Sequence, residues 1–174
     1  AISGETIDYG PCAFMDVYNP ETVFSSIDQH GRYSYKNQPS IVHWNLLRFA
    51  ETLLPLIHNK RDKAIQIVEG IFSNFNSVYK KHWLKMMRKK LGLLNEKDED
   101  EDLITSLLSW MQTNKADYTN TFSSLVEKDI LNNERYRDSV FVDWHNRWLL
   151  RLMLNKKPIK KSFDLMKKNN PVVI

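Results

Sequence analysis

The sequence has only one cysteine, Cys12, which excludes an intrachain disulfide and a zinc site built from cysteines. A lone cysteine with no evident base nearby is more often a small core residue than a nucleophile. With 5 glycines and 6 prolines in 174 residues, the chain is not of the disordered or turn-rich kind. No apolar run approaches the roughly 18 residues of a membrane-spanning helix. We therefore expect no membrane partner and a reducing compartment, which is the cytoplasm for a bacterial source and the mitochondrion for a eukaryotic one.

Several familiar motifs of nucleotide and metal enzymes are also absent from these residues. There is no Walker loop, no Gly-x-Gly-x-x-Gly and no Gly-x-Ser-x-Gly nucleophile turn. No histidine stands at metal-ligand spacing from a carboxylate, which argues against a zinc site. The five histidines are His30, His43, His58, His82 and His145. The chain by itself therefore does not form a complete catalytic centre of these classes.

The formal net charge is +4, a mildly basic balance that is common among soluble enzymes as well as nucleic-acid binders. A basic cluster on one predicted helix has two interpretations: a phosphate-contacting face, or the solvated side of an amphipathic helix. Aromatic residues do not alternate with the cations as single-strand binding requires, and an acidic run at 96–102 follows. We favour the solvated side, so nucleic acid is not an expected partner. A helical module that binds protein or nucleic acid remains the alternative. The basic cluster comprises Lys80, Lys81, Lys85, Arg88, Lys89 and Lys90.

From residue 38 onward, apolar residues recur every three or four positions, which predicts a mostly α-helical body. Pro39 suits a first helical turn, and Gly92 suits the end of a helix. The acidic run at 96–102 complements the dipole at the start of the helix that follows it. The expected helices cover about 39–57, 64–91, 103–111, 118–128, 134–155 and 160–168.

Residues 1–37 are irregular and rich in turn formers. We expect a short strand at 1–7, which then runs into a loop. Asn19-Pro20-Glu21 predicts a short helix with Asn19 as its cap. No linker divides the chain, so we expect one domain over 1–174, with loops in 1–37 and a helical body in 38–174.

The segment 4–11 contains an Asp8-Tyr9-Gly10 triplet after the apolar Ile7. An Asp-aromatic-Gly triplet after a strand is the magnesium-binding pattern of protein kinases. The carboxylate reaches a metal on the nucleotide phosphates, the aromatic residue anchors the loop, and the glycine allows a sharp turn. The alternative is an ordinary turn after a strand, because such triplets also occur by chance.

The triplet belongs to a longer series of blocks that resembles the selenoprotein O family, also called the YdiU family. The resemblance covers essentially the whole chain, and the blocks occur in the family's order. They are Gly4-Glu5-Thr6-Ile7-Asp8-Tyr9-Gly10-Pro11, Phe14-Met15-Asp16, Tyr18, Asp28, Gly31-Arg32-Tyr33, Asn37-Gln38-Pro39, Trp44-Asn45-Leu46, Met87-Arg88-Lys89-Lys90-Leu91-Gly92-Leu93, Asp117-Tyr118-Thr119-Asn120-Thr121-Phe122 and Asn170-Pro171.

The resemblance implies a protein-kinase-like fold, of which this chain is the helical C-terminal lobe with a loop-rich N-terminal segment. The implied activity is protein adenylylation, or AMPylation: AMP moves from ATP to a Ser, Thr or Tyr hydroxyl of a target protein. The family's members were long regarded as pseudokinases. Asp8 matches the metal-binding aspartate that also lies against the nucleotide phosphates. ATP, Mg²⁺ and protein substrates are therefore the expected cofactors and partners.

The resemblance also places much of the catalytic machinery upstream of Ala1. The missing parts are the proposed catalytic base, a second metal ligand, and the N-terminal lobe with its phosphate-binding residues. We therefore expect the fragment alone to be inactive and to pair with that lobe in its parent. An ordinary kinase-like phosphotransferase remains a second alternative.

Two further expectations concern the N-terminal segment. Arg32 lies where kinases place the activation segment, and we expect it to anchor that segment through a carboxylate or backbone carbonyls rather than to reach the nucleotide. The strand at 1–7 has no good partner in the helical remainder. We therefore expect it to form no regular ladder within the chain.

Overall fold

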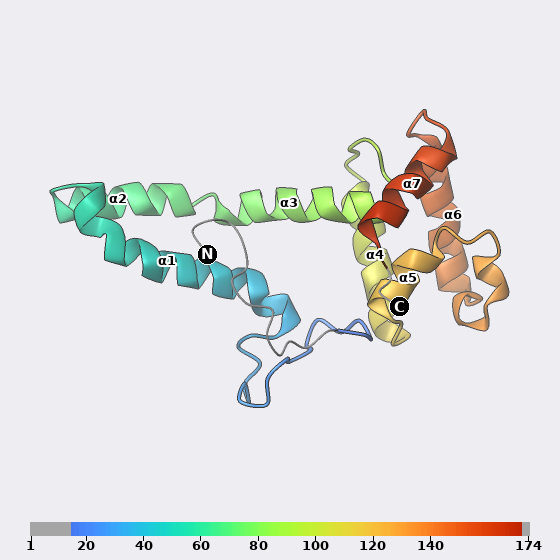
Figure 1. The fold of residues 1–174 in the computed structure, drawn as a ribbon, viewed down its shortest axis with the longest axis horizontal. Coiled ribbons are helices and arrows are strands. Elements are labelled where there is room, and N and C mark those ends of the chain that lie inside the picture. Colours follow the sequence, from blue (N-terminus) through green and yellow to red (C-terminus); the bar gives the residue numbers. More distant parts are fainter. Residues whose placement is uncertain (1–14, 172–174) are drawn as a thin grey trace.

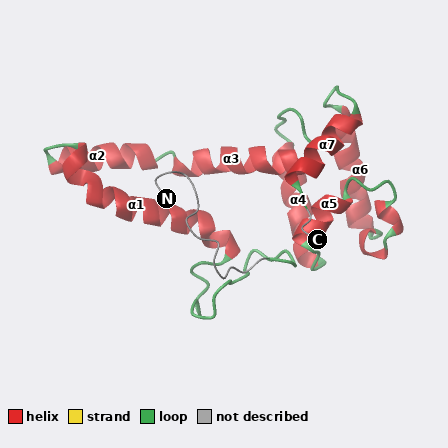
Figure 2. Cartoon of the chain, in the orientation of Figure 1, coloured by secondary structure: helices red, strands yellow, loops and turns green. Residues whose placement is uncertain are grey.

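The computed structural model describes residues 15–171, and these are mostly helical, as the periodicity predicts (Figures 1 and 2). Between residues 15 and 171 there is no strand, and a single isolated bridge joins Val17 to Asp117. None of the described helices is long and apolar enough to cross a membrane. The α-helices are α1 (Gln38–Ile57), α2 (Arg61–Phe72), α3 (Phe75–Lys90), α4 (Asp100–Thr113), α5 (Tyr118–Ser124), α6 (Ser139–Met153) and α7 (Ile159–Asn169). Three short 3-10 helices are η1 (Tyr35–Asn37), η2 (Ile130–Asn132) and η3 (Glu134–Tyr136).

The helices form two parts that α3 connects. Helices α4 to α7 gather at one end of α3, whereas α1 and α2 run side by side at its other end as a projecting arm (Figure 1). The arm has a small packing layer of its own, made by Ala50 of α1 with Ala64 and Val68 of α2. The large hydrophobic core lies at the other end, where α3, α4, α6 and α7 meet.

Helix α6 shows how the core forms from the predicted apolar stripe. Its Trp144 and Trp148 are 3% and 0% exposed, and their rings stack with centroids 6.1 Å apart. A buried indole N–H needs an acceptor. Trp148 Nε1 donates to the Leu91 carbonyl at 2.9 Å, and Trp144 Nε1 donates to the Leu103 carbonyl at 2.8 Å. The two rings thereby fasten α6 to the end of α3 and the start of α4.

The predicted single helix over 64–91 is wrong, because the chain breaks it into α2 and α3. The break falls at Ser73 and Asn74, between Phe72 and Phe75. The Ser73 hydroxyl donates to the Gly70 carbonyl at 2.8 Å, so the side chain competes for the helix's backbone groups. His43 of α1 lies against both flanking rings, with centroids 5.7 Å from Phe72 and 4.5 Å from Phe75. This packing fixes the direction of α3 relative to the arm.

The predicted short helix at Asn19-Pro20-Glu21 is also wrong, and the structure has a turn there. The Asn19 side chain accepts from the Glu21 amide at 2.9 Å, and its carbonyl accepts from the Thr22 amide at 3.0 Å. The helix does not continue because the next carbonyl groups bond elsewhere. The Pro20 carbonyl accepts from Lys36 and the Thr22 carbonyl accepts from Tyr35, both at 2.9 Å.

Two later helices are shorter than predicted. Helix α5 ends at Ser124, because the chain then turns to bury Leu125 and Ile130, which are 1% and 2% exposed. The helix expected from residue 134 begins only at Ser139, after the 3-10 turn η3. Asp138 sets that start, since its carboxylate accepts from the Phe141 amide at 3.1 Å as an N-terminal cap.

Candidate functional site

Asp8, the predicted ligand of the metal and the nucleotide, lies outside the described residues. So do Cys12 and the segment 1–7 for which we expect no regular ladder. Within residues 15–171, no three His, Cys, Asp or Glu side chains gather in a way that could hold a metal ion. The part of the site that the structure describes is therefore the segment that begins at Met15, together with the helices that contact it.

That segment enters the described region along the start of α5. The Tyr18 amide donates to the Ala116 carbonyl at 2.9 Å, and the Tyr118 amide donates to the Asp16 carbonyl at 2.7 Å. These two bonds form the isolated antiparallel bridge between Val17 and Asp117. Asp117 also caps α5, because its carboxylate accepts from the Asn120 amide at 2.7 Å. The chain that follows residue 14 is thus tied to a capped helix end.

Aromatic rings reinforce the bridge. The Tyr18 and Tyr118 rings stack with centroids 5.7 Å apart, and Tyr35 meets Tyr18 edge-on at 6.1 Å. Two effects raise the pKa of Tyr118 far above that of a free tyrosine: burial is the larger one, and the neighbouring Tyr35 adds to it. Burial also raises the pKa of Tyr18. The raised pKa keeps both phenols neutral at physiological pH, and their stacked rings pack the entering segment against α5.

The loop that follows is organised around Asp28. Its carboxylate accepts from the Arg32 amide at 2.8 Å and from the Tyr33 amide at 2.7 Å. Gly31, which lies between Asp28 and Arg32 in the sequence, has a φ of +64°, a conformation that glycine adopts without strain. The Asn37 side chain then donates to the Gly31 carbonyl at 2.8 Å and leads into α1. The blocks Asp28, Gly31-Arg32-Tyr33 and Asn37 therefore make one hydrogen-bonded loop.

Among the described residues, Arg32 anchors this loop through aromatic rings and not through the groups predicted for it. Its guanidinium lies over the Trp44 ring of α1 at 4.8 Å from the centroid, and 5.7 Å from that of Tyr33. Within residues 15–171 the partner is thus an aromatic face and not the expected carboxylate or carbonyl. Trp44 is 45% exposed, and its ring offers a broad surface beside the loop. Stacking of Arg on Trp is a known stabilising contact.

We expect Arg32→Ala to lower the stability of the loop modestly and to leave activity intact. An exposed cation–π contact contributes about 0.5–1 kcal/mol. Thermal melting and the rate of the AMP transfer that the family resemblance implies, both measured on the full-length protein, check this. An unchanged melting temperature with a lost transfer rate would show instead that Arg32 reaches the nucleotide.

The end of α3 is a second meeting point of the blocks that carry the resemblance. The Lys90 ammonium donates to the Asn169 carbonyl at 3.3 Å and to the Asn170 side-chain oxygen at 3.2 Å. It also lies over the rings of Tyr118 and Phe122, at 5.5 and 5.3 Å from their centroids. The Asn170 side-chain Nδ2 donates back to the Lys90 carbonyl at 2.9 Å. Burial lowers the pKa of Lys90. This lysine therefore joins α3, α5 and the end of α7.

A buried ion cluster that sequence reasoning missed holds α3, α4 and α6 together. Asp100, 0% exposed, accepts from Arg88 Nε and from Arg151 Nε, both at 2.6 Å. Burial by itself raises the pKa of Asp100. The hydrogen bonds from Arg151, Arg88 and the Lys97 amide outweigh that effect, and the net pKa is lowered. One signal was available in the sequence, because Arg151 stands on the same face of its helix as the buried Trp148.

The basic cluster of α3 is partly used inside the protein, so Arg88 and Lys90 are not part of the solvated face that we favoured. Arg88 and Lys90 make the contacts described above. Lys80 pairs with Glu101 of α4 at 2.8 Å. The alternative of a phosphate-contacting face is left with only part of the cluster.

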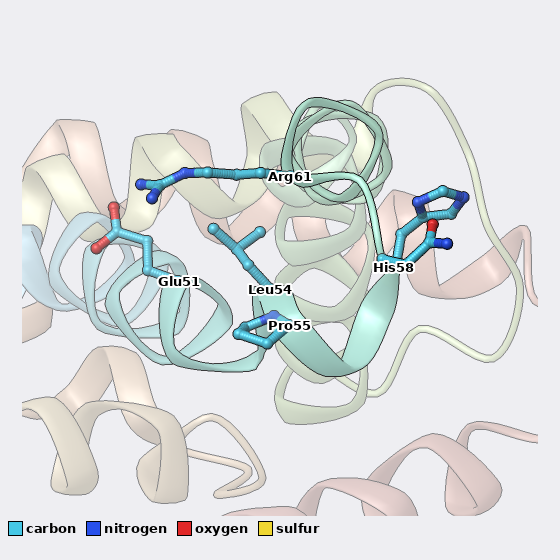
Figure 3. Close-up of a pocket in the computed structure, with 6 residues that line it drawn as sticks. Glu51, Leu54, Pro55, His58 and Arg61 are labelled. Carbon is cyan, nitrogen blue, oxygen red and sulfur yellow. The ribbon is translucent and has the colours of Figure 1, made fainter.

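A pocket of about 290 Å³ lies at the turn between α1 and α2 (Figure 3). Glu51, Leu54, Pro55, His58 and Arg61 line it, together with Asn59. His58 Nδ1 accepts from the Lys60 amide at 2.9 Å, so one ring nitrogen is already engaged. Glu51 also pairs with the exposed Arg48 at 2.5 Å. None of these residues belongs to a block that carries the family resemblance, and the pocket lies on the arm, away from the bridge at Tyr18.

Comparison with known proteins gives one family over the whole chain. The family model described as "Protein adenylyltransferase SelO" matches residues 1–174. A relative named "Protein nucleotidyltransferase YdiU" from Pelagibacter ubique (strain HTCC1062) is 55% identical over 174 residues, which are 100% of this chain and 36% of the relative. Relatives of the same name from Nitrosococcus oceani and Clostridium beijerinckii are 52% and 54% identical over the whole chain, which covers 35% and 36% of their lengths. The chain thus spans about a third of the length of these relatives.

Proposed function

The chain belongs to the family of protein adenylyltransferase SelO, and from this premise we propose that its full-length protein transfers AMP from ATP to Ser, Thr or Tyr hydroxyls of target proteins. The observation that carries the proposal is the match over all 174 residues, with relatives named as nucleotidyltransferases. The 174 residues supply a helical body and Asp8. The remaining nucleotide-binding parts belong to the longer polypeptide.

We assign Asp8 to the metal and the nucleotide. A carboxylate is the hard oxygen ligand that Mg²⁺ prefers, and one or two carboxylates with the substrate's phosphates commonly hold this ion. When bound, Mg²⁺ would offset negative charge on the phosphates. The residues after Asp8 have a positioning task. The bridge at Tyr18 and the loop around Asp28 hold the chain from Met15 onward, and we propose that this anchoring helps to position Asp8.

The bacterial relatives and the single thiol support a bacterial cytoplasmic location for the full-length protein. ATP and protein substrates are both available there.

The competing function is ordinary phosphotransfer by a kinase-like site, and the fold alone does not separate the two. The position of the radioactive phosphorus that is transferred from ATP to protein separates the two reactions. We expect the full-length protein to transfer radioactivity to protein from ATP labelled at the α-phosphorus, and none from ATP labelled at the γ-phosphorus. The opposite pattern would establish phosphotransfer and exclude adenylylation.

A further prediction concerns the 174 residues alone. One carboxylate does not hold magnesium–ATP in water, because Mg²⁺ gives up its hydration shell reluctantly. We therefore expect calorimetry of this chain with magnesium–ATP to show no binding in the micromolar range. A saturable micromolar signal would place the nucleotide site on residues other than those proposed.

A further inference from the structure

Helix α1 has two apolar faces, and only one of them is packed in the described part of the chain. The packed face contains Ala50, 8% exposed, which lies against α2 with its Ala64 and Val68. The other face contains five large apolar residues and is largely open to solvent. It extends along α1, which forms the arm together with α2 (Figure 1).

The open face has a regular spacing. Its residues are separated by four, three, four and three positions, which is the heptad pattern of a helix that packs lengthwise on another helix. Leu56 is 83% exposed, Val42 and Phe49 are 47% exposed, and Leu46 is 40% exposed. We call this face the outer stripe of α1: Val42, Leu46, Phe49, Leu53 and Leu56. A contiguous apolar surface of this kind marks an interaction site.

The borders of the outer stripe indicate which chemistry would cover it. The positions along one border are the uncharged Gln38, Asn45, Thr52 and Asn59. The only Asp, Glu, Lys or Arg residues of α1 are Arg48 and Glu51, which pair with each other. Helices that lie on membranes have Lys or Arg on the polar face, and nucleic-acid surfaces require cations. A border without charge instead suits the interior of a protein.

The segment that covers the outer stripe can come from the rest of the polypeptide, because the relatives are much longer than this chain. This chain covers 36% of the relative from Pelagibacter ubique, so most of such a polypeptide lies outside the matched residues. We propose that the outer stripe of α1 is an internal interface, covered in the full-length protein by an apolar helix from outside these 174 residues. The covering helix packs nearly parallel or antiparallel to α1, as heptad spacing requires. This inference does not depend on AMP transfer.

Photo-cross-linking in the full-length protein tests the interface. A photoreactive phenylalanine analogue is placed at Phe49, in the middle of the outer stripe, and a second variant carries it at Leu56 in case the first does not fold. We expect each to form a cross-link within one molecule, and peptide mass spectrometry should map it to a segment outside the 174 residues. The matched control is the same analogue at Glu51, on another face of α1. It should cross-link to α2, since Glu51 shares a pocket with Arg61 (Figure 3).

Three outcomes would overturn the proposal. A product of twice the protein's mass would show that a second copy covers the stripe. Cross-links to added phospholipid vesicles would show a lipid surface. A folded variant that gives no cross-link from Phe49 or Leu56, while Glu51 still reaches α2, would show that the stripe stays open to solvent.

Discussion

Asp8→Asn in the full-length protein is expected to abolish AMP transfer and to leave the fold intact. The substitution keeps the size of the side chain but removes the charge that a carboxylate contributes to Mg²⁺. Substitution of a residue that only hydrogen-bonds to a metal ligand already lowers metal affinity or activity by roughly 10–100-fold. Loss of a direct ligand should therefore exceed about 100-fold. The measurement is the rate of AMP incorporation at saturating ATP and magnesium.

Asp16→Asn is the matched control, because Asp16 lies in the same segment and engages Tyr118 through its backbone carbonyl. Its exposed carboxylate should be dispensable, and transfer should stay near that of the unmodified protein. If Asp8→Asn kept its activity, or if Asp16→Asn lost as much as Asp8→Asn, the assignment of the metal to Asp8 would be wrong.

Asp100→Asn should have the largest effect on stability. It leaves the guanidinium groups of Arg88 and Arg151, which are 12% and 7% exposed, without their common counter-ion. Removing one member of a buried ion pair costs about 3–5 kcal/mol. Hydrogen exchange of the α4 and α6 amides in the full-length protein measures the loss as a lower free energy of opening.

The control for this variant is Asp102→Asn, two residues further along α4. Asp102 pairs with Arg147, but both side chains are more than half exposed. An exposed pair contributes about 0–1 kcal/mol, so the exchange rates should hardly change. Equal effects of Asp100→Asn and Asp102→Asn would refute the role of burial in the cluster.

The Asp100 cluster also predicts a pH dependence. Because the pKa of Asp100 is lowered in the folded protein, its contribution is fully present above the unfolded pKa of about 3.9. The contribution is lost as the pH falls below that value, through the folded pKa. The difference in opening free energy between the unmodified protein and Asp100→Asn should therefore be constant at neutral pH and shrink in acid. A difference that grew toward acid would contradict the lowered pKa.

The helical body could be predicted from the sequence because its apolar residues repeat at helical spacing. Gly92 shows which features of the helical body the sequence predicts and which it does not. It was expected to end a helix, and its φ of +70° agrees with that. The sequence could not show that an added Cβ would meet the sulfur of Met166 and the Ser162 carbonyl at 2.9 Å. That close approach depends on α7, which is distant in sequence.

The errors also have physical reasons. We interpreted the acidic run at 96–102 through the helix dipole, and that argument does not distinguish one acidic residue of the run from another. Only Asp100 is buried among arginines, and that choice depends on where α3 and α6 lie. The break between α2 and α3 depends on His43 packing on Phe72 and Phe75 across the arm. The role of Asp8 stays a prediction, and the described residues explain only how the segment after it is held.

The most direct test of the central claim is intact-mass spectrometry of the full-length protein after incubation with ATP, magnesium and candidate substrate proteins. We predict that a substrate, or the protein itself, gains the mass of an AMP group while pyrophosphate appears in solution. A gain of the mass of a phosphate group, with release of ADP, would contradict the proposal that this chain is part of a protein adenylyltransferase.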